Sequence, residues 1–296
     1  MSNGSTEPTH APRPRAEYGL LLRLTGPLQS WGLHSHFNER DTAPFPTRSG
    51  LIGLLASALG RARQDPIDDL ARLSLAVRTD RPGVLLRDLH TVGGGLPAKA
   101  TVTTAEGKKR PGDTGTLLTH RTYLADAAFT AALTLLDETD DGRALLAHCA
   151  DALRHPRWPL YLGRRSCPPE GQLLLGASDD ALHDLIHLPI AAPPPRRADR
   201  DGRCAVDFLA DRPLIQLPVS PDMVTPGNQD GTHSSGNLND QPTGFHPSRR
   251  AYRARPLYRR TLVLPVTQFT GLGLAHLTTL SAYIDTHLTT AQGSRQ

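Results

Sequence analysis

A long segment with almost no core-forming residues interrupts this 296-residue chain. It runs from Gly93 to His120, contains GGG and AEGKKRPGDTGT, and separates two strand-like runs. A connection of this length inside a domain is usually functional or disordered. From Thr91 to Thr122 it carries five basic residues against two acidic ones. A charge run is often only a solvated face, but this one also has the flexibility and cations that suit a hairpin gripping a nucleic-acid backbone.

The runs before the insert predict the first half of a compact core. YGLLLRLTG, from Tyr18 to Gly26, alternates at period two and predicts a half-buried strand. Ser49 to Arg61 is apolar almost all round and predicts a helix buried on most sides. ARLSLAVRTD and GVLLRDLHTV then predict two strands that are joined by a turn at residues 81–83.

The runs after the insert complete the pattern. TYLADAAFTAALTLL predicts a strand, and DGRALLAHCADALRHP predicts an amphipathic helix that ends at Pro156. A short strand follows at residues 173–175. The order is βαββαβ with an elaborated hairpin, which is the ferredoxin-like pattern. The predicted fold class is therefore α+β, with a hairpin inserted into a ferredoxin-like domain.

The composition changes beyond residue 176. A linker-like AAPPPRRADRDGR precedes short predicted strands in VDFLADRPLIQLP, and SPDMVTPGNQDGTHSSGNLNDQPTGFHP reads as low-complexity loop. LAHLTTLSAYIDTHL can form a terminal helix. We predict a disordered tail at 1–16, a ferredoxin-like domain at 17–176, and a small β region with loops and an arginine-rich tail at 177–296.

Bulk properties narrow the class of protein. The net charge of +4 is compatible with nucleic acid without establishing it. Three widely spaced cysteines argue against a disulfide framework or a zinc knuckle. No apolar leader begins the chain, and no run approaches the ~18 apolar residues of a membrane span. We expect a soluble, cytoplasmic protein without a cofactor.

The helix at Ser49–Arg61 is preceded by a motif that has two interpretations. Thr47 or Ser49 can cap the first turn, and capping needs no basic residue. Arg48 is left over, and a helix N-terminus with a nearby cation can hold phosphate. A Walker loop is excluded because its Gly-Lys-Ser/Thr spacing is absent.

Three other motifs are compatible with RNA contact. In GPLQSWG, residues 26–32, Gln29, Ser30 and Trp31 can read a nucleotide, or Trp31 can plug the edge of the core. LGRRSCPP offers Arg164 and Arg165, which suit phosphates or form a solvated pair. SRRAYRARPLYRR interleaves arginines with tyrosines, as in a single-strand groove or an arm that packs on a partner. The loop histidines of HSH, residues 34–36, are a weak metal signal.

Five ordered motifs carry a resemblance to a known family. LRLTGPLQSWG, FPTRSGLIGLLASALG, DLHTV, TYLADAAFTAAL and HPRWPLYLGRRSCPP resemble the CasD family of the RAMP superfamily, over roughly residues 18–176. The resemblance implies an RRM-like ferredoxin domain with a protruding β-hairpin thumb at residues 91–122, plus a small C-terminal β region. It also implies a subunit that caps one end of the type I-E CRISPR Cascade complex.

What the resemblance implies about partners is specific. The subunit would hold the 5′ handle of the crRNA and would contact the backbone subunit CasC and the large subunit CasA. It would contact target DNA only indirectly, and no membrane partner is implied. The implied RNA-binding residues come from the motifs and the thumb: Arg23, Gln29, Ser30, Trp31, Arg48, Ser49, His90, Lys99, Lys108, Lys109, Arg110, His120, Arg121, Tyr123, Arg164 and Arg165. No catalytic or metal residue is expected.

A second hypothesis remains beside the non-catalytic binder. His120, Tyr123 or Lys99 can supply the acid and base of a metal-independent endoribonuclease that processes precursor crRNA. The type I-E character of the motifs and the lack of a tight His/Lys/Tyr cluster in the sequence favour the binder. A purely structural bridging subunit is the third alternative.

Overall fold

The computed structural model describes residues 16–33, 38–93, 97–100, 108–109, 116–136, 139–195, 201–224, 231–246 and 250–289. Its first half is a ferredoxin-like core, with elements in the order β1 (Gly19–Thr25), α1 (Arg48–Ala58), β4 (Leu73–Arg81), β7 (Ala128–Leu135), α2 (Asp140–Arg154) and β8 (Leu174–Ser178). The strands pair antiparallel in the order β4-β7-β1-β8. This arrangement confirms the predicted fold class.

The core strand β1 is buried on both faces. Leu20, Leu22 and Leu24 join the hydrophobic cluster beneath α1 and α2, whereas Leu21 joins a second cluster on the opposite face of the sheet. The prediction of a half-buried strand is wrong for this reason. The second layer comes from elements far along the chain, so the period-two pattern of β1 alone did not reveal it.

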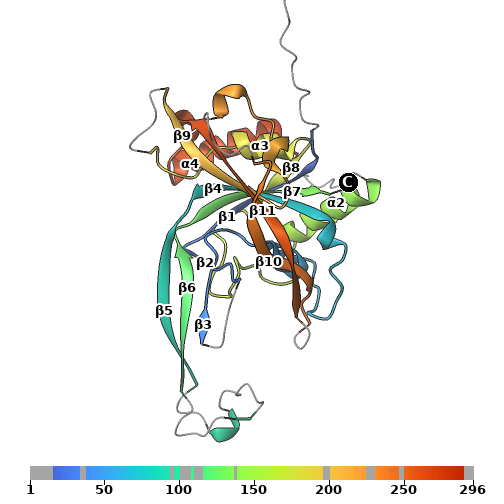
Figure 1. Ribbon diagram of the computed structural model, residues 1–296, viewed down its shortest axis with the longest axis vertical. Helices are drawn as coiled ribbons and strands as arrows, with labels where there is room; N and C mark the ends of the chain where they lie inside the picture. Colours follow the sequence, from blue (N-terminus) through green and yellow to red (C-terminus); the bar gives the residue numbers. More distant parts are fainter. Residues whose placement is uncertain are drawn as a thin grey trace, which may run out of the picture.

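The C-terminal region extends the same sheet and covers its second face. β9 (Arg203–Ala210) pairs with β4, β11 (Ala251–Pro265) pairs with β9, and β10 (Ser234–Gly244) lies at the edge of the seven-stranded sheet (Figure 1). Two helices, α3 (Ala181–His187) and α4 (Leu274–His287), pack into the second cluster. The predicted terminal helix is confirmed by α4.

The low-complexity interpretation of residues 220–247 is wrong for β10. SSGNLNDQPTG pairs antiparallel with β11, although the register shifts three times along the pair. Serine, asparagine and glycine have poor strand propensity, but the long partner strand supplies the hydrogen-bonding ladder. A strand of this kind is specified by its neighbour and carries little periodic signal of its own.

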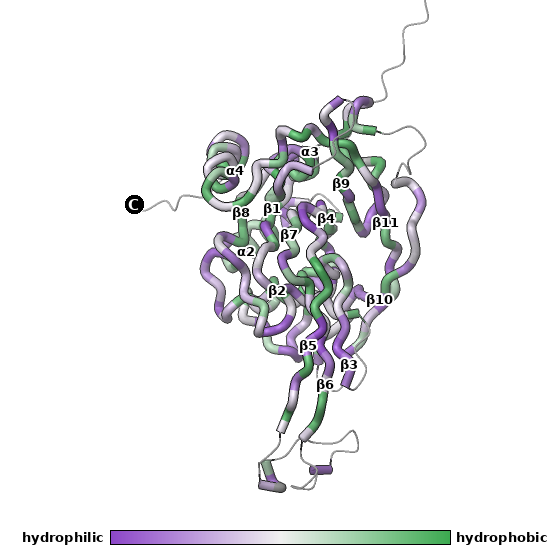
Figure 2. The backbone as a smooth tube through the Cα atoms, turned by 90° about the vertical axis from the view of Figure 1, so that its left-hand side faces the viewer, coloured by the Kyte–Doolittle hydropathy of each residue, from purple (hydrophilic) through white to green (hydrophobic). Residues whose placement is uncertain are grey.

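The inserted hairpin is longer than the sequence predicted. β5 (Val84–Val92) and β6 (Leu117–Ala125) pair residue for residue, and short strands β2 (Leu28–Gln29) and β3 (Glu39–Arg40) flank β6. The hairpin projects from the core (Figures 1 and 2). GVLLRDLHTV is therefore a thumb strand, and TYLADAAFTAALTLL is split at Asp126, whose φ is 55°. In the described residues, short 3-10 turns lie at Leu70–Arg72, Ala98–Ala100, Leu214–Gln216, Pro221–Met223 and Val266–Gln268.

Candidate nucleic-acid interface

A cleft of about 510 Å³ opens between α1, the loop that follows α2 and the β10–β11 hairpin. Its lining contains five arginines and no carboxylate. The charged and aromatic side chains that line it are Arg61, Arg63, Arg164, Arg165, Arg250, Trp31, Trp158, Tyr161, Phe245 and Tyr252. A cationic groove with aromatic side chains is the arrangement that binds single-stranded nucleic acid.

Three of the arginines are available to a ligand. Arg63, Arg165 and Arg250 are exposed, and none makes an ion pair with a carboxylate in the described part of the chain. The guanidinium carbon of Arg250 lies 5.5 Å from the ring centroid of Tyr252 and 5.9 Å from that of Phe245. Such a stack holds the cation in place while its N–H groups stay open to an anion.

The other two arginines are partly committed to the protein. Arg61 forms a salt bridge with Asp69, which raises the pKa of Arg61 through their hydrogen bond. Arg164 donates to the backbone carbonyls of Thr122, Arg40 and Asp41 at 2.7–2.9 Å. Arg164 therefore ties the thumb strand to the cleft, while its neighbour Arg165 is exposed at the rim.

The floor of the cleft is built by the GPLQSWG motif. Trp31 is fully buried, and its indole N–H donates to Oε1 of Gln29 at 3.0 Å. The Gln29 amide donates to the carbonyls of Leu24 and Ala127, each at 2.9 Å. The interpretation of Trp31 as a core plug is thus confirmed, and nucleotide reading by Gln29 or Trp31 is wrong because their side chains are buried and satisfied. Ser30 lies at the cleft but is only 4% exposed.

Close backbone contacts explain the glycines beside that floor. A Cβ on Gly163 would lie 1.7 Å from the carbonyl oxygen of Ser30, and the φ of Gly163 is 96°. Only glycine permits both this approach and this left-handed conformation. The LGRR motif is therefore held against the QSW motif, which places Arg165 at the cleft.

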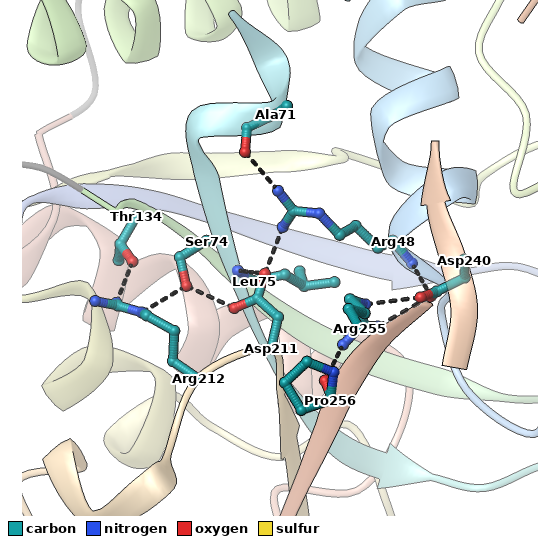
Figure 3. Close-up of polar contacts among 10 residues, drawn as sticks. All are labelled: Arg48, Ala71, Ser74, Leu75, Thr134, Asp211, Arg212, Asp240, Arg255 and Pro256. Atoms are coloured by element: carbon teal, nitrogen blue, oxygen red, sulfur yellow. Dashed lines mark hydrogen bonds and ion pairs between the residues drawn. The ribbon is translucent and has the colours of Figure 1, made fainter. Parts of the chain in front are cut away.

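Arg48 is a structural residue, contrary to the prediction. It is 3% exposed, and its guanidinium pairs with Asp211 and donates to the Ala71 carbonyl at 2.9 Å (Figure 3). Burial lowers the pKa of Arg48, and the Asp211 charge partly offsets this. Its guanidinium is buried and bound to groups inside the protein, so it cannot reach a phosphate.

The N-terminus of α1 does hold an anion, but the anion belongs to the chain. The Arg48 backbone N–H donates to Oδ2 of Asp240 at 2.8 Å. Thr47 is the N-cap and accepts from the Gly50 N–H, which confirms the capping interpretation. Ser49 is half-buried and lies 3.4 Å from the Thr47 hydroxyl, so it adds only a polar group to the lining.

The chain matches a family model and a relative of established name. Residues 19–258 match the family described as CRISPR-associated protein (Cas_Cas5). The chain is 37% identical over 214 residues to the CRISPR system Cascade subunit CasD of Escherichia coli (strain K12), covering 67% of this chain and 90% of that protein. The chain belongs to the Cas5 family. The predicted family is confirmed.

Solved structures agree with this Cas5 assignment. A chain of a CRISPR RNA-guided surveillance complex is 39% identical to this chain, with a TM-score of 0.71. The match covers 90% of this chain and 99% of the other. A crystal structure of a Cas protein is 33% identical with a TM-score of 0.51, covering 86% of this chain and 98% of its own. The family match ends at residue 258, so α4 of this Cas5 chain lies beyond it.

The remaining predicted residues of this Cas5 chain that the structure describes lie outside the cleft. His90, His120 and Arg121 are on the β5–β6 hairpin, Lys99, Lys108 and Lys109 lie between its strands in sequence, and Arg110 lies outside the described residues. Tyr123 is 2% exposed and its hydroxyl accepts a hydrogen bond from Ser166. The prediction that Tyr123 contacts RNA is therefore wrong. Arg23 is on β1 and donates to the Glu170 carbonyl, away from the cleft.

The RNA-binding residues assigned from the sequence omit seven of the ten charged and aromatic side chains that line the cleft in this Cas5 chain. The missed residues are Arg61, Arg63, Trp158, Tyr161, Phe245, Arg250 and Tyr252. Trp158 and Tyr161 stand inside the HPRWPLYLGRR motif, and Arg250 and Tyr252 inside the arginine-rich segment. The second stretch was already interpreted as a possible single-strand groove, but nothing in the sequence indicated that the two stretches face each other.

Two other kinds of site are absent from the described residues. No group of three or more His, Cys, Asp or Glu side chains there is arranged to hold a metal ion. His34 and His36 lie outside the described residues. Within the same described ranges, no helix is both long and apolar enough to span a membrane.

Proposed function

We propose that this chain is a non-catalytic Cascade subunit that binds the 5′ handle of crRNA in the cleft between α1 and the β10–β11 hairpin, and so acts in antiviral DNA interference. One observation carries the proposal: the lining combines five arginines and four aromatic side chains besides Trp31, with no carboxylate. Phosphates need cations, and unstacked bases need rings. The 37% identical protein of Escherichia coli (strain K12) is a Cascade subunit, which supplies the biological setting.

The β5–β6 hairpin is the surface we assign to protein partners. Its strands expose apolar side chains over 45–70% of their area: Val84, Leu85, Leu86, Leu89 and Leu118. An apolar ribbon of this kind on a projecting hairpin indicates a contact that is buried in an assembly. We assign it to the backbone subunit CasC, and a contact with CasA completes the cap of the complex.

The endoribonuclease alternative is less well supported. Its candidate groups were His120, Tyr123 and Lys99, and none of them lines the cleft. Tyr123 is buried beneath Arg164, whose guanidinium lies 4.8 Å from its ring centroid. A general acid or base must reach the reacting oxygen. The cleft itself offers arginines, which remain protonated and serve as poor bases.

The chain has two tryptophans, which makes the binding test direct. Trp31 is fully buried, whereas Trp158 is 42% exposed and lines the cleft. Titration with single-stranded RNA of the handle sequence is expected to quench the fluorescence of Trp158, with a salt-dependent affinity. Trp158→Phe keeps an aromatic ring and is expected to bind while losing the signal. Absence of both binding and quenching in the wild-type chain would overturn the proposal.

A cleavage assay separates the two hypotheses. The purified chain is incubated with labelled repeat RNA in a metal chelator and the products are resolved on a denaturing gel. We expect intact RNA. Specific cleavage that His120→Ala or Lys99→Ala abolishes would favour the nuclease instead.

A further inference from the structure

The β10–β11 hairpin is attached to α1 through one buried carboxylate. Asp240, on β10, is 1% exposed. It accepts from the Arg48 backbone N–H at 2.8 Å and from Nε and Nη2 of Arg255, on β11, at 2.7 and 2.9 Å. A single side chain therefore joins the first residue of α1 to both strands of the hairpin (Figure 3).

The attachment continues into the core sheet. The Arg48 guanidinium pairs with Asp211, which follows β9, and Asp211 accepts from Ser74 Oγ of β4 at 2.7 Å. Arg212 donates to the same hydroxyl at 2.7 Å and to Thr134 of β7 at 2.9 Å. Buried ion pairs contribute little net stability but fix one arrangement strongly, because any other leaves a charge uncompensated.

The hairpin carries one whole wall of the cleft beyond this attachment. Phe245, Arg250 and Tyr252 belong to it and face the lining residues of α1 and of the loop after α2. The Phe245 Cζ lies 3.8 Å from the position of a Cβ on Gly53 of α1. The end of the hairpin thus rests on the same helix whose first backbone N–H, that of Arg48, donates to Asp240.

We propose that Arg48, Asp240 and Arg255 are positioning residues for RNA: they seat the β10–β11 hairpin on α1, so that Arg250 and Tyr252 form the second wall of the cleft. This inference rests on the proposed function. It assigns the Thr47–Gly50 motif and part of the arginine-rich segment to one task, which neither stretch indicates alone. None of the three touches the RNA.

The direction in which one substitution changes RNA affinity separates this positioning role from a simple effect of charge. Asp240→Asn removes a negative charge close to a cationic cleft. If charge alone mattered, affinity for RNA would rise. If Asp240 seats the hairpin, affinity falls, since an amide cannot hold both Arg255 nitrogens as a carboxylate does.

The experiment measures handle RNA affinity by fluorescence anisotropy in a cycle of variants of the full chain. Asp240→Asn is combined with the wall variant Arg250→Ala/Tyr252→Ala. The control is Asp207→Asn, which removes the partner of Arg259 elsewhere on the same sheet. We expect Asp240→Asn to weaken RNA binding about tenfold in the wild-type chain and to cause no further loss of affinity in the wall variant. It should also reduce the salt dependence of the affinity, as Arg250→Ala does.

Circular dichroism checks that each variant folds. If Asp240→Asn does not, Arg255→Lys takes its place in the cycle, because it keeps the charge and gives up the paired hydrogen bonds. Unchanged or tighter binding, or a loss that adds to that of the wall variant, would overturn the inference while the proposed function stands. Failure of the wild-type chain to bind RNA would remove both.

Discussion

Two arginines in similar motifs have opposite roles in this chain. Arg48 in TRSG is buried and paired, and Arg165 in LGRR is exposed at the cleft. The sequence indicated a cation near a helix N-terminus but not the acidic partners Asp211 and Asp240, which lie more than 160 residues away. A local motif predicts that a basic residue lies beside a helix or turn. Pairing with acidic residues far along the chain decides whether that residue is structural or free to bind a ligand.

Removing the Arg48 side chain is expected to reduce stability, and to weaken RNA binding only indirectly, through the seating of the β10–β11 hairpin. Arg48→Ala leaves Asp211 as an unpaired buried charge, so the free energy of unfolding should fall by about 3–5 kcal/mol in a denaturant titration. The matched variant Arg165→Ala should change it by less than about 0.5 kcal/mol and weaken RNA binding. A stability loss below about 1 kcal/mol for Arg48→Ala would show that the buried pair is not formed.

Gly163 is expected to tolerate no side chain. Gly163→Ala forces a Cβ against the Ser30 carbonyl at a φ of 96°, and should cost about 2 kcal/mol or more of unfolding free energy. Gly244→Ala is the control, because no atom lies within 4 Å of the place that its Cβ would take and its φ is not left-handed. Equal stability of the two alanine variants would contradict the close contact between the two motifs.

At the scale of elements, helices and strands with strong hydrophobic periodicity were predicted, whereas elements with weak periodicity were missed. α1 and α2 were predicted because apolar spacing and helix-end signals mark them locally, and the β4–β5 turn was predicted because Pro82 and Gly83 separate two strand-like runs. β10 was missed because its polar residues gain strand structure only through β11. The helix α3 was also missed, since seven residues give too short a pattern to distinguish from a buried strand.

Helix α4 is expected to be less firmly held in acid. His276 is 3% exposed, its Nδ1 lies 2.8 Å from the Thr270 hydroxyl, and burial followed by the charge of Arg23 lowers its pKa below 6.5. The other charged groups that act on it are Asp80, Arg78 and Arg81. The unfolded chain therefore binds the proton more readily, and stability is lost as the pH falls below about 6.5.

The measurement is the thermal midpoint at pH 7.5 and 5.5. The wild-type chain should lose more than His276→Gln, which can still bond Thr270 but does not titrate. His187, whose pKa burial also lowers, remains in both chains and contributes equally. The same pH dependence in both would show that His276 does not titrate in this range.

At the scale of the whole molecule, one sheet connects the ferredoxin-like motifs to the C-terminal region. The ferredoxin-like strands occupy β4-β7-β1-β8, and β9, β11 and β10 continue the sheet beyond β4. This continuity brings residues near 250 to residues near 60 and 160 and so creates the cleft. The fold class followed from element order, whereas the cleft could not, since the sequence does not show that the two halves share a sheet.

The central claim is that this cleft binds RNA through its cations, and affinity under varied salt tests it most directly. One variant carries Arg63→Gln, Arg165→Gln and Arg250→Gln. Its control carries Arg143→Gln, Arg203→Gln and Arg259→Gln, which change the net charge equally but do not line the cleft. We predict an affinity loss on the order of 100-fold and a salt slope smaller by about 2 for the cleft variant, with a far smaller change in the control. Equal losses in the two variants would contradict the account, because binding would then depend on net charge and not on the cleft.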